Sequence, residues 1–189
     1  QVIKEQGPIS KPQIAKITKL SLPTVNKIVE SLLEEKSISI SGYGKSAGGR
    51  KPLLYEINTE ASSVLAIYFE GESIKGANSN MLGQIREKKQ IEVDYTSKNT
   101  VLENTFEIID DLFERSKTRA IGVGVPGVVK EDGTIYNIPN ITGWEGLNLK
   151  QILKKRYEVP IFIENDVNLT AIGAYFSQLN EQYSDVIYI

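Results

Sequence analysis

The stretch Val159–Asn168 constrains the fold most, because an apolar run there ends abruptly in two amides and two carboxylates. β-Branched residues with a proline near the start predict a strand that is buried on both faces. Apolar residues then recur at helical spacing, at Leu169, Ile172, Tyr175, Phe176 and Leu179. A buried strand therefore turns into a helix at Asn165 and Asp166, and ligands of open α/β sheets bind at such ends.

Asp166 has two interpretations at this junction. Aspartate is one of the residues that most often cap the N-terminus of a helix, by accepting a backbone N–H. A carboxylate at the end of a buried strand can equally belong to a ligand site, and the two roles are compatible. The residues around Asp166 alone leave both interpretations open.

The composition excludes several classes of chemistry. The 189 residues contain no cysteine and no histidine, so they offer no disulfide framework, no ordinary zinc site and no Ser-His or Cys-His catalysis. From the residues themselves we expect neither a metal nor a cofactor. No apolar segment approaches the roughly 20 residues that span a bilayer, and there is no basic-then-apolar leader. We therefore expect a cytoplasmic protein without a membrane partner.

Charge divides the chain into two parts. Residues 1–58 carry nine Lys and Arg against five Asp and Glu, whereas residues 59–189 carry thirteen against nineteen. A small basic part beside a larger acidic one is typical of a nucleic-acid-binding module joined to a ligand-binding domain. The sequence begins without a methionine, and its apolar pattern is already under way at Val2 and Ile3, which suggests a trimmed N-terminus.

Two closely spaced helices are predicted in the basic part. Ser10-Lys-Pro-Gln13 fits a capping box, and the helix that it starts runs to Thr18. A second helix runs from Ser21 to Lys36. The residues expected to be buried are Ile14, Ala15 and Ile17 in the first helix and Val25, Ile28, Val29, Leu32 and Leu33 in the second. This spacing is that of a helix-turn-helix.

A hairpin follows the helices. Residues 37–41 and 53–57 alternate as strands, and the segment 42–51 between them is rich in glycine and basic residues. Helices followed by such a hairpin predict a winged helix-turn-helix that binds double-stranded DNA, with Gly48 and Gly49 letting the backbone approach a groove. The residues expected to contact DNA are Lys19, Ser21, Thr24, Asn26, Lys27, Arg50 and Lys51. The alternative is a solvated polar face with a flexible loop.

The acidic part alternates strands and helices. Strands are predicted at 64–69, 74–78, 84–93, 120–125 and 159–165, and helices at 100–116, 147–157 and 169–179. The first three strands are consecutive, which implies an antiparallel meander. An apolar strand at 185–189 stops at the last residue, so we expect the fold to continue beyond it.

The segment Gly122–Gly127 formally matches the dinucleotide-binding fingerprint. That fingerprint must open a helix, whereas Pro126 and the sequel 128–133, with a turn at Asp132-Gly133, favour a hairpin. We reject the Rossmann interpretation. Pro126 and Gly127 are more consistent with a rigid backbone wall beside a ligand.

The loop 137–144 is too apolar and aromatic to be only a connector. The amide of Asn140, the hydroxyl of Thr142 and the flat face of Trp144 suit the hydroxyls and C–H faces of a sugar. The alternative is that Trp144 fills the core beneath the loop.

The chain resembles regulators of the ROK family (repressors, open reading frames, kinases) of the xylose-repressor type, because four motifs occur in the order found in that family. They are Gly49-Arg-Lys-Pro52 after two helices, Gly122–Gly127, Pro139-Asn-Ile-Thr-Gly-Trp144 and Glu164-Asn-Asp-Val-Asn168. The resemblance implies an actin-like, ribonuclease-H-like lobe, apparently incomplete at its C-terminus, that binds a sugar or sugar derivative. The implied ligand-binding residues are Gly127, Asn140, Thr142, Asn165 and Asp166. Any zinc site of the family would lie beyond Ile189.

Departures from the family pattern oppose kinase activity. The kinases carry Asp-x-Gly-Gly-Thr between the first two strands, and here Tyr68, Glu70 and Glu72 replace the aspartate, one glycine and the threonine. Carboxylates repel a triphosphate. A glutamate that often follows the glycine of the Asn-Asp helix is Ala174 here, which puts that sugar contact in doubt.

The resulting hypothesis is a sugar-responsive transcriptional repressor without catalysis. Its expected partners are operator DNA, a sugar effector and further copies of itself, as a dimer or tetramer. The alternative is a ROK sugar kinase that uses Asp166 as general base. A third possibility is a lobe that serves only as a scaffold for another protein.

Overall fold

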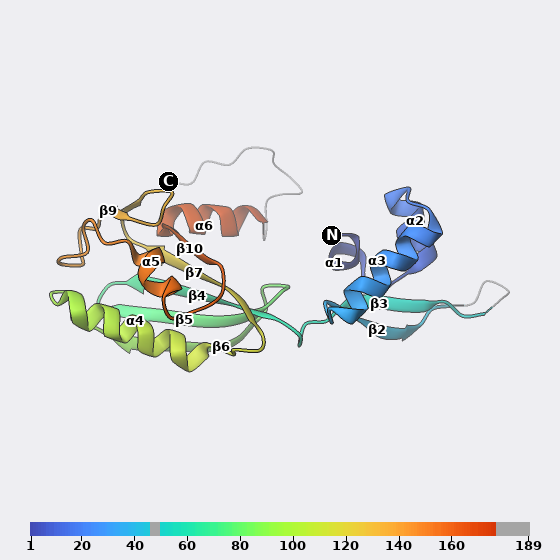
Figure 1. Cartoon of the computed structure of the whole chain (residues 1–189), viewed down its shortest axis with the longest axis horizontal. Coiled ribbons are helices and arrows are strands. Elements are labelled where there is room, and N and C mark those ends of the chain that lie inside the picture. The colour runs from blue at the N-terminus through green and yellow to red at the C-terminus, as the bar shows by residue number, and fades with distance from the viewer. Residues whose placement is uncertain (46–49, 177–189) are drawn as a thin grey trace. The chain divides into compact units, whose positions relative to one another are not determined.

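The computed structural model of the chain describes residues 1–45 and 50–176 (Figure 1). It contains two compact units, one built from Gln1–Ser62 with Asn80–Gly83, and one built from Ser63–Ser79 and the residues from Gln84 onward. The predictions for Gly48, Gly49, Leu179 and the strand 185–189 lie outside the described residues. The two units are described separately below.

The first unit combines short helices with a small antiparallel sheet (Figure 1). Its elements are α1 (Val2–Gln6), β1 (Ile9–Ser10), α2 (Lys11–Thr18), α3 (Leu22–Glu34), β2 (Ile38–Tyr43) and β3 (Leu53–Ile57). The strand order is β1-β3-β2, and β2 and β3 form the predicted hairpin. The sequence located each of these elements except α1 and the two-residue β1.

The starts of α2 and α3 follow from capping. The Gln13 side chain accepts from the backbone N–H of Ser10 at 3.0 Å and from its hydroxyl at 2.6 Å, which completes the predicted capping box. Ser21 is the N-cap of α3 and accepts from the N–H of Thr24 at 3.3 Å. Between the helices, Lys19 ends α2 with a left-handed φ of 58°. This conformation turns the chain sharply enough for α2 and α3 to pack together.

Two predicted core residues of this unit are exposed. Val25 and Val29 are buried as expected, but Ile17 and Ile28 keep 42% and 45% of their surface exposed. At roughly 100° per residue, Ile28 lies about 60° around α3 from Val25, at the margin of the apolar stripe. The stripe is therefore wider than the surface that α2 and the small sheet can cover.

The second unit is a five-stranded sheet with helices on both faces. Its elements are β4 (Ser63–Glu70), β5 (Ser73–Asn80), β6 (Ile85–Glu92), α4 (Lys98–Leu112), β7 (Thr118–Val125), β8 (Val128–Val129), β9 (Ile135–Asn137), α5 (Leu149–Lys154), β10 (Ile161–Asn165) and α6 (Asp166–Ala174). The strand order is β10-β7-β4-β5-β6. Strands β10, β7 and β4 are parallel, and β5 and β6 are antiparallel.

The main core lies between this sheet and α4. Leu65, Ile67 and Phe69 alternate along β4 toward that face and are buried. On β5, Gly76 leaves room for Leu112 and Ile108 of α4 to lie against the backbone, since a Cβ at Gly76 would stand 2.7 Å from Leu112 Cδ1. Helix α6 lies on the opposite face, over β7 and β10 (Figure 1).

The prediction that β10 is buried on both faces is wrong. Ile161 is buried, but Phe162 is 61% exposed. The reason is position, because β10 is at the edge of the sheet and pairs with β7 on one side. On α6, Val167, Leu169 and Ile172 are also exposed, so among the described residues nothing covers this apolar surface.

The glycine-rich segment 122–127 forms the end of β7 and leads into a hairpin, as the sequence predicted. Strand β8 begins at Val128 and pairs antiparallel with β9. Gly133 has a left-handed φ of 84°, and Asp132 accepts from the N–H of Thr134 at 2.9 Å. Because no helix follows Gly127, the dinucleotide-binding interpretation is excluded.

Candidate functional site

Asn165 organises the junction between β10 and α6. It is the N-cap of the helix, since its side-chain oxygen accepts from the N–H of Asn168 at 3.0 Å. Its amide nitrogen donates to the carbonyl oxygen of Gly127 at 2.8 Å and also lies 3.2 Å from Asp166 Oδ1. Of the two interpretations of Asp166, the structure excludes the helix cap, because the preceding Asn165 has the extended backbone that a cap requires.

Asp166 occupies the first turn of α6. Its Oδ1 accepts from the N–H of Val167 at 2.8 Å and from the amide of Asn165. The residue is partly exposed. Because Asp166 does not cap the helix, its carboxylate can still accept a hydrogen bond from a ligand hydroxyl.

Glu164 also stabilises the junction, although it was not among the predicted ligand residues. Its Oε1 accepts from the N–H of Asn165 at 2.8 Å and from the side-chain amide of Asn168 at 3.1 Å. The motif Glu164-Asn-Asp-Val-Asn168 thus forms one hydrogen-bonded unit. The short spacing of these polar residues is the only sequence signal for it.

Gly127 packs closely against the loop that follows β9. A Cβ at this position would lie 2.1 Å from the carbonyl oxygen of Asn137 and 3.0 Å from Ile138 Cα. Glycine is therefore required by contact between two backbones. Together with the bond from Asn165, this places Gly127, Asn165 and Asp166 at the ends of the neighbouring strands β7 and β10.

Asn140 and Thr142 belong to a different group. Both are exposed and line a hollow of about 780 Å³, here called the Asn140 hollow. Its lining residues are Gly71, Glu72, Glu92, Val93, Asp94, Tyr95, Thr96, Asn140 and Thr142. The five predicted ligand residues thus fall into two clusters, joined by the loop that touches Gly127 at Asn137 and Ile138.

Hydrogen bonds between distant segments build the Asn140 hollow. The N–H of Thr142 donates to the carbonyl of Tyr95 at 3.0 Å, and the N–H of Val93 donates to the carbonyl of Glu72 at 2.8 Å. The buried Tyr95 hydroxyl donates to the carbonyl of Ser73, and burial raises the pKa of Tyr95 to about 12. The sequence did not indicate that Glu92 and Asp94 lie beside Asn140.

Trp144 is a core residue and offers no face to a sugar. It is 0% exposed and stands edge-on to Phe69, with ring centroids 5.4 Å apart. Its indole N–H donates to the carbonyl of Lys98 at 3.3 Å. Of the two interpretations of this tryptophan, the structural one is correct.

The turn between β4 and β5 differs from a phosphate-binding loop. Gly71, with a φ of 58°, and Glu72 make a tight two-residue turn. The Glu70 carboxylate forms an ion pair with Lys75, whose positive charge offsets it, and the sequence did not indicate this pair. Glu72 is exposed and lines the Asn140 hollow.

In the first unit, a groove of about 620 Å³ lies beside the start of α3. Its lining residues are Lys11, Pro12, Leu22, Asn26, Tyr43, Arg50, Lys51, Pro52, Leu53 and Tyr55. It therefore joins Asn26, Arg50 and Lys51, three of the predicted DNA contacts. It adds Lys11 and Tyr43, which the sequence analysis missed because their proximity depends on the packing of α2 against the hairpin.

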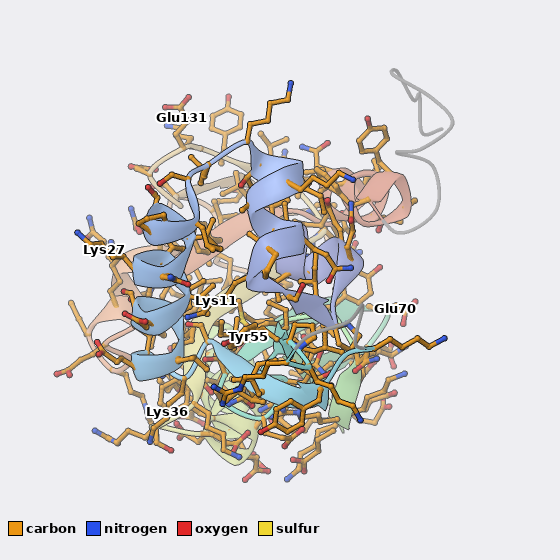
Figure 2. All side chains as sticks on the ribbon, turned by 90° about the vertical axis from the view of Figure 1, so that its right-hand side faces the viewer. Lys11, Lys27, Lys36, Tyr55, Glu70 and Glu131 are labelled. Atoms are coloured by element: carbon orange, nitrogen blue, oxygen red, sulfur yellow. The ribbon has the colours of Figure 1, made fainter. Side chains whose placement is uncertain are left out.

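The charges of this groove are positive. Lys11 lies 5.8 Å from the centre of the Tyr55 ring and 3.7 Å from Glu30 Oε1. Figure 2 shows Lys11 close to Tyr55, with Lys27 on the outer side of α3. No Asp or Glu is among the described residues that line the groove.

The remaining predicted DNA contacts surround the turn between α2 and α3. Lys19, Ser21, Thr24 and Lys27 are all exposed. The hydroxyls of Ser21 and Thr24 lie 2.8 Å apart, so each orients the other while Ser21 also caps the helix. Cations therefore occur both at the turn, as Lys19 and Lys27, and in the groove, as Lys11, Arg50 and Lys51.

Two further observations concern metals and membranes. Within residues 1–45 and 50–176, no group of three or more His, Cys, Asp or Glu side chains is arranged to hold a metal ion. In the same residues, no helix has both the length and the apolar character needed to cross a bilayer.

Comparison with known proteins identifies the second unit. Residues 64–189 match the ROK family. The chain belongs to this family. It is 30% identical to a xylose repressor of Caldicellulosiruptor bescii, over 96% of this chain and 47% of that protein. The ROK chain therefore spans about half the length of the curated relatives that it matches.

Solved ROK structures share its fold. A ROK family transcriptional regulator, described as a homologue of the Escherichia coli MLC protein, superimposes on 95% of this chain and 47% of its own, with a TM-score of 0.76 and 19% identity. A ROK family glucokinase from Streptomyces griseus, in complex with glucose and AMPPNP, covers 60% of this chain and 36% of its own, with a TM-score of 0.54 and 24% identity. The mixed α/β unit thus has a fold that it shares with these ROK structures.

Proposed function

We propose that the ROK chain is the DNA-binding and effector-binding part of a transcriptional repressor that responds to a sugar. The observation that carries the proposal is the basic groove beside α3, in a chain that matches a xylose repressor along nearly its whole length. The kinase matches cover about 60% of the chain and the regulator covers 95%. A regulator therefore accounts for the first unit, which a kinase does not.

We infer that the first unit is a winged helix-turn-helix. Helices α2 and α3 meet across the Lys19 turn, and the hairpin β2–β3 follows as the wing. In this arrangement the second helix enters the major groove of DNA. The residues proposed to face DNA are Lys19, Ser21, Thr24, Asn26, Lys27, Arg50 and Lys51, with Lys11 and Tyr43 added by the groove.

The second unit supplies the effector site. We propose that the hydroxyls of a sugar engage Asn140 and Thr142 in the hollow, and Asn165 and Asp166 at the start of α6. Gly127 contacts both clusters. Its carbonyl accepts from the side-chain amide of Asn165, and its backbone lies against the loop that leads to Asn140. Sugar binding then lowers the affinity of the protein for its operator.

The operator response tests this proposal directly. The intact protein would select its operator from random duplexes, and binding would be followed by fluorescence anisotropy while xylose and other aldoses are added. We expect nanomolar-range operator affinity at physiological salt and release by one of the sugars. A protein that binds no duplex more tightly than random DNA would refute the repressor assignment.

Substitutions at the wing and at α3 should have different effects. Arg50→Ala is expected to weaken binding to operator and random DNA alike and to reduce the salt slope by about one. Asn26→Ala is expected to weaken operator binding by about 1–3 kcal/mol and leave random DNA unaffected, because a helix presents its amide rigidly to a base edge. Titrations with both DNAs at several salt concentrations measure this.

Lys16→Ala is a matched control for Arg50→Ala. Lys16 is an exposed cation of α2 outside the groove, so its loss should have a smaller effect on the salt slope. If Arg50→Ala abolished base discrimination while Asn26→Ala was silent, the roles of wing and helix would be the reverse of those proposed.

A sugar kinase is the second candidate, because Asp166 and Asn165 occupy the strand–helix junction of a fold shared with a glucokinase. We expect no sugar-dependent release of ADP by the intact protein. Glu72 stands where the kinase motif has threonine, and a carboxylate at that position repels the phosphates of ATP. A coupled assay with an aldose panel and Mg-ATP measures this. Turnover that disappears in Asp166→Asn would establish the kinase instead.

Further copies of the chain are proposed partners. Proteins that read DNA with a helix-turn-helix commonly bind as dimers to two half-sites about one helical turn apart. We therefore propose a homodimer or a tetramer on a palindromic operator, acting in the cytoplasm where that DNA lies.

A further inference from the structure

Leu22 is an apolar residue at the surface of the basic groove. It is the first residue of α3, it is 46% exposed, and it lines the groove together with Asn26, one helical turn later. Leu22 is not among the buried or partly buried residues that make up the apolar core of the first unit. Its exposed surface is therefore available to a ligand that enters the groove.

The start of α3 holds Leu22 in a fixed position. Ser21 caps the helix by accepting from the N–H of Thr24 at 3.3 Å, and Pro23 restricts the backbone of the first turn. Regular helix geometry places Asn26 about 6 Å further along the helix axis and about 40° around it. Leu22 and Asn26 therefore reach the groove as neighbours on one rigid element.

Asn26 offers hydrogen-bonding groups beside this apolar surface. Its side chain is half-buried, and within residues 1–45 and 50–176 its amide group has no hydrogen-bond partner. The amide of an asparagine pairs in a bidentate manner with adenine in the major groove of DNA. A phosphate group gains nothing from an apolar neighbour, so an amide and a leucine side by side point to the edges of bases.

The charge of the groove identifies DNA as its occupant. Lys11, Arg50 and Lys51 line it, and the described lining residues include no Asp or Glu. Such cations neutralise the phosphates on either side of a base edge. In the major groove, the apolar group that a base edge presents is the C5-methyl group of thymine. An exposed leucine at this place therefore matches a thymine.

We propose that Leu22 packs against the C5-methyl group of a thymine in the operator. The inference rests on the proposed DNA binding and deepens it by naming a base that the groove selects. Base pairs are about 3.4 Å apart along the duplex, so this thymine lies within about two base pairs of the adenine that Asn26 reads. Leu22 then adds discrimination that the cations of the groove cannot supply, because phosphate contacts carry no sequence information.

Replacement of thymine by deoxyuridine tests the proposal, because it removes the methyl group and keeps every hydrogen-bonding group of the base. The intact protein would be titrated with its selected operator, in which one thymine at a time is replaced in both half-sites. We expect one replacement to weaken binding about threefold to fivefold per half-site, the effect of removing one methyl group from apolar surroundings. An operator in which every such replacement is silent would overturn the proposal.

Variants of Leu22 assign the effect to this side chain. Leu22→Ala should weaken operator binding at least as much as the deoxyuridine does and should remove the sensitivity to deoxyuridine at that one position. Leu22→Met keeps an apolar side chain of similar volume and should keep the sensitivity. Both variants should melt within a few degrees of wild type, because Leu22 lies outside the core. Equal sensitivity to deoxyuridine in wild type and Leu22→Ala would contradict the contact.

Leu20→Ala is the matched control. Leu20 is 43% exposed and lies two positions before Leu22, but it does not line the groove. Its replacement should leave the deoxyuridine effect at its wild-type size. If Leu20→Ala removed this effect as completely as Leu22→Ala does, the methyl group would not be read from the groove.

Random duplexes distinguish a failure of this inference from a failure of the proposed function. Equal weakening of operator and random DNA by Leu22→Ala would place the side chain against the DNA backbone, which overturns the inference and leaves the repressor assignment standing. A protein that binds no duplex more tightly than random DNA would refute the repressor assignment and this inference with it.

Discussion

Gly127→Ala is expected to destabilise the second unit by about 3 kcal/mol, which would lower its melting temperature by roughly 10 °C. The added Cβ would lie 2.1 Å from the carbonyl oxygen of Asn137 and 3.0 Å from Ile138 Cα. Both obstacles are backbone atoms, so no side-chain rotation relieves the clash. The loop 137–144 must move, and with it the bond between Asn165 and the Gly127 carbonyl. Thermal melts of wild type and variant measure the loss.

Gly122→Ala provides the matched control within the same glycine-rich segment. A Cβ at Gly122 would meet only the carbonyl oxygen of Leu65, at 3.8 Å, which is an ordinary contact. We expect this variant to be neutral or more stable by up to about 1 kcal/mol, because alanine loses less conformational freedom on folding. If both alanines were tolerated equally, Gly127 would not be the backbone contact described here.

Asp166→Asn is expected to abolish the effector response while preserving the fold. The capping interaction belongs to Asn165, and the amide oxygen of an asparagine can still accept from the N–H of Val167. The variant should therefore melt within a few degrees of wild type and bind its operator normally. Loss of a charge-assisted bond to a sugar hydroxyl costs roughly 1.5–3 kcal/mol, or about ten- to more than a hundredfold in sugar affinity. Operator occupancy during a sugar titration shows the difference.

Two control variants make this result specific. Glu131→Gln replaces another exposed carboxylate with an amide in the β8–β9 hairpin (Figure 2) and should leave the response intact. Asn165→Ala removes the helix cap and the bond to Gly127, and should lower stability by about 0.5–2 kcal/mol as well as the sugar response. An undiminished sugar response in Asp166→Asn would exclude this carboxylate from the effector site.

Short-range interactions made much of the fold predictable from the sequence. The Ser10–Gln13 capping box, the Ser21 cap and the Asp132-Gly133 turn each involve residues within three positions of one another. The patterns at 64–69 and 100–116 predicted a strand and a helix where β4 and α4 lie, because the periods of both elements follow from backbone geometry. The family motifs added the order of the two units, and the match to the ROK family over residues 64–189 confirmed the resemblance.

Placement between distant segments was decided by the tertiary structure alone. Nothing near Phe162 reveals that β10 lies at the edge of the sheet, since an apolar run has the same pattern at an edge and at the centre. Trp144 fills the core because Phe69, far earlier in the chain, lies under the loop. The sequence could leave both roles of this residue open but could not choose between them.

In the candidate site, too, the sequence determined some properties and the tertiary structure determined others. The sequence by itself determined the chemistry of Asn140, Thr142, Asn165 and Asp166, because amides, hydroxyls and carboxylates keep their donors and acceptors in any fold. Only the folded chain separates these residues into two clusters and sets Glu72, Glu92 and Asp94 beside Asn140. The physical reason is that the charge environment of a site sums over all segments that reach it, and here those segments meet through the β4–β5 turn, the end of β6 and the loop after β9.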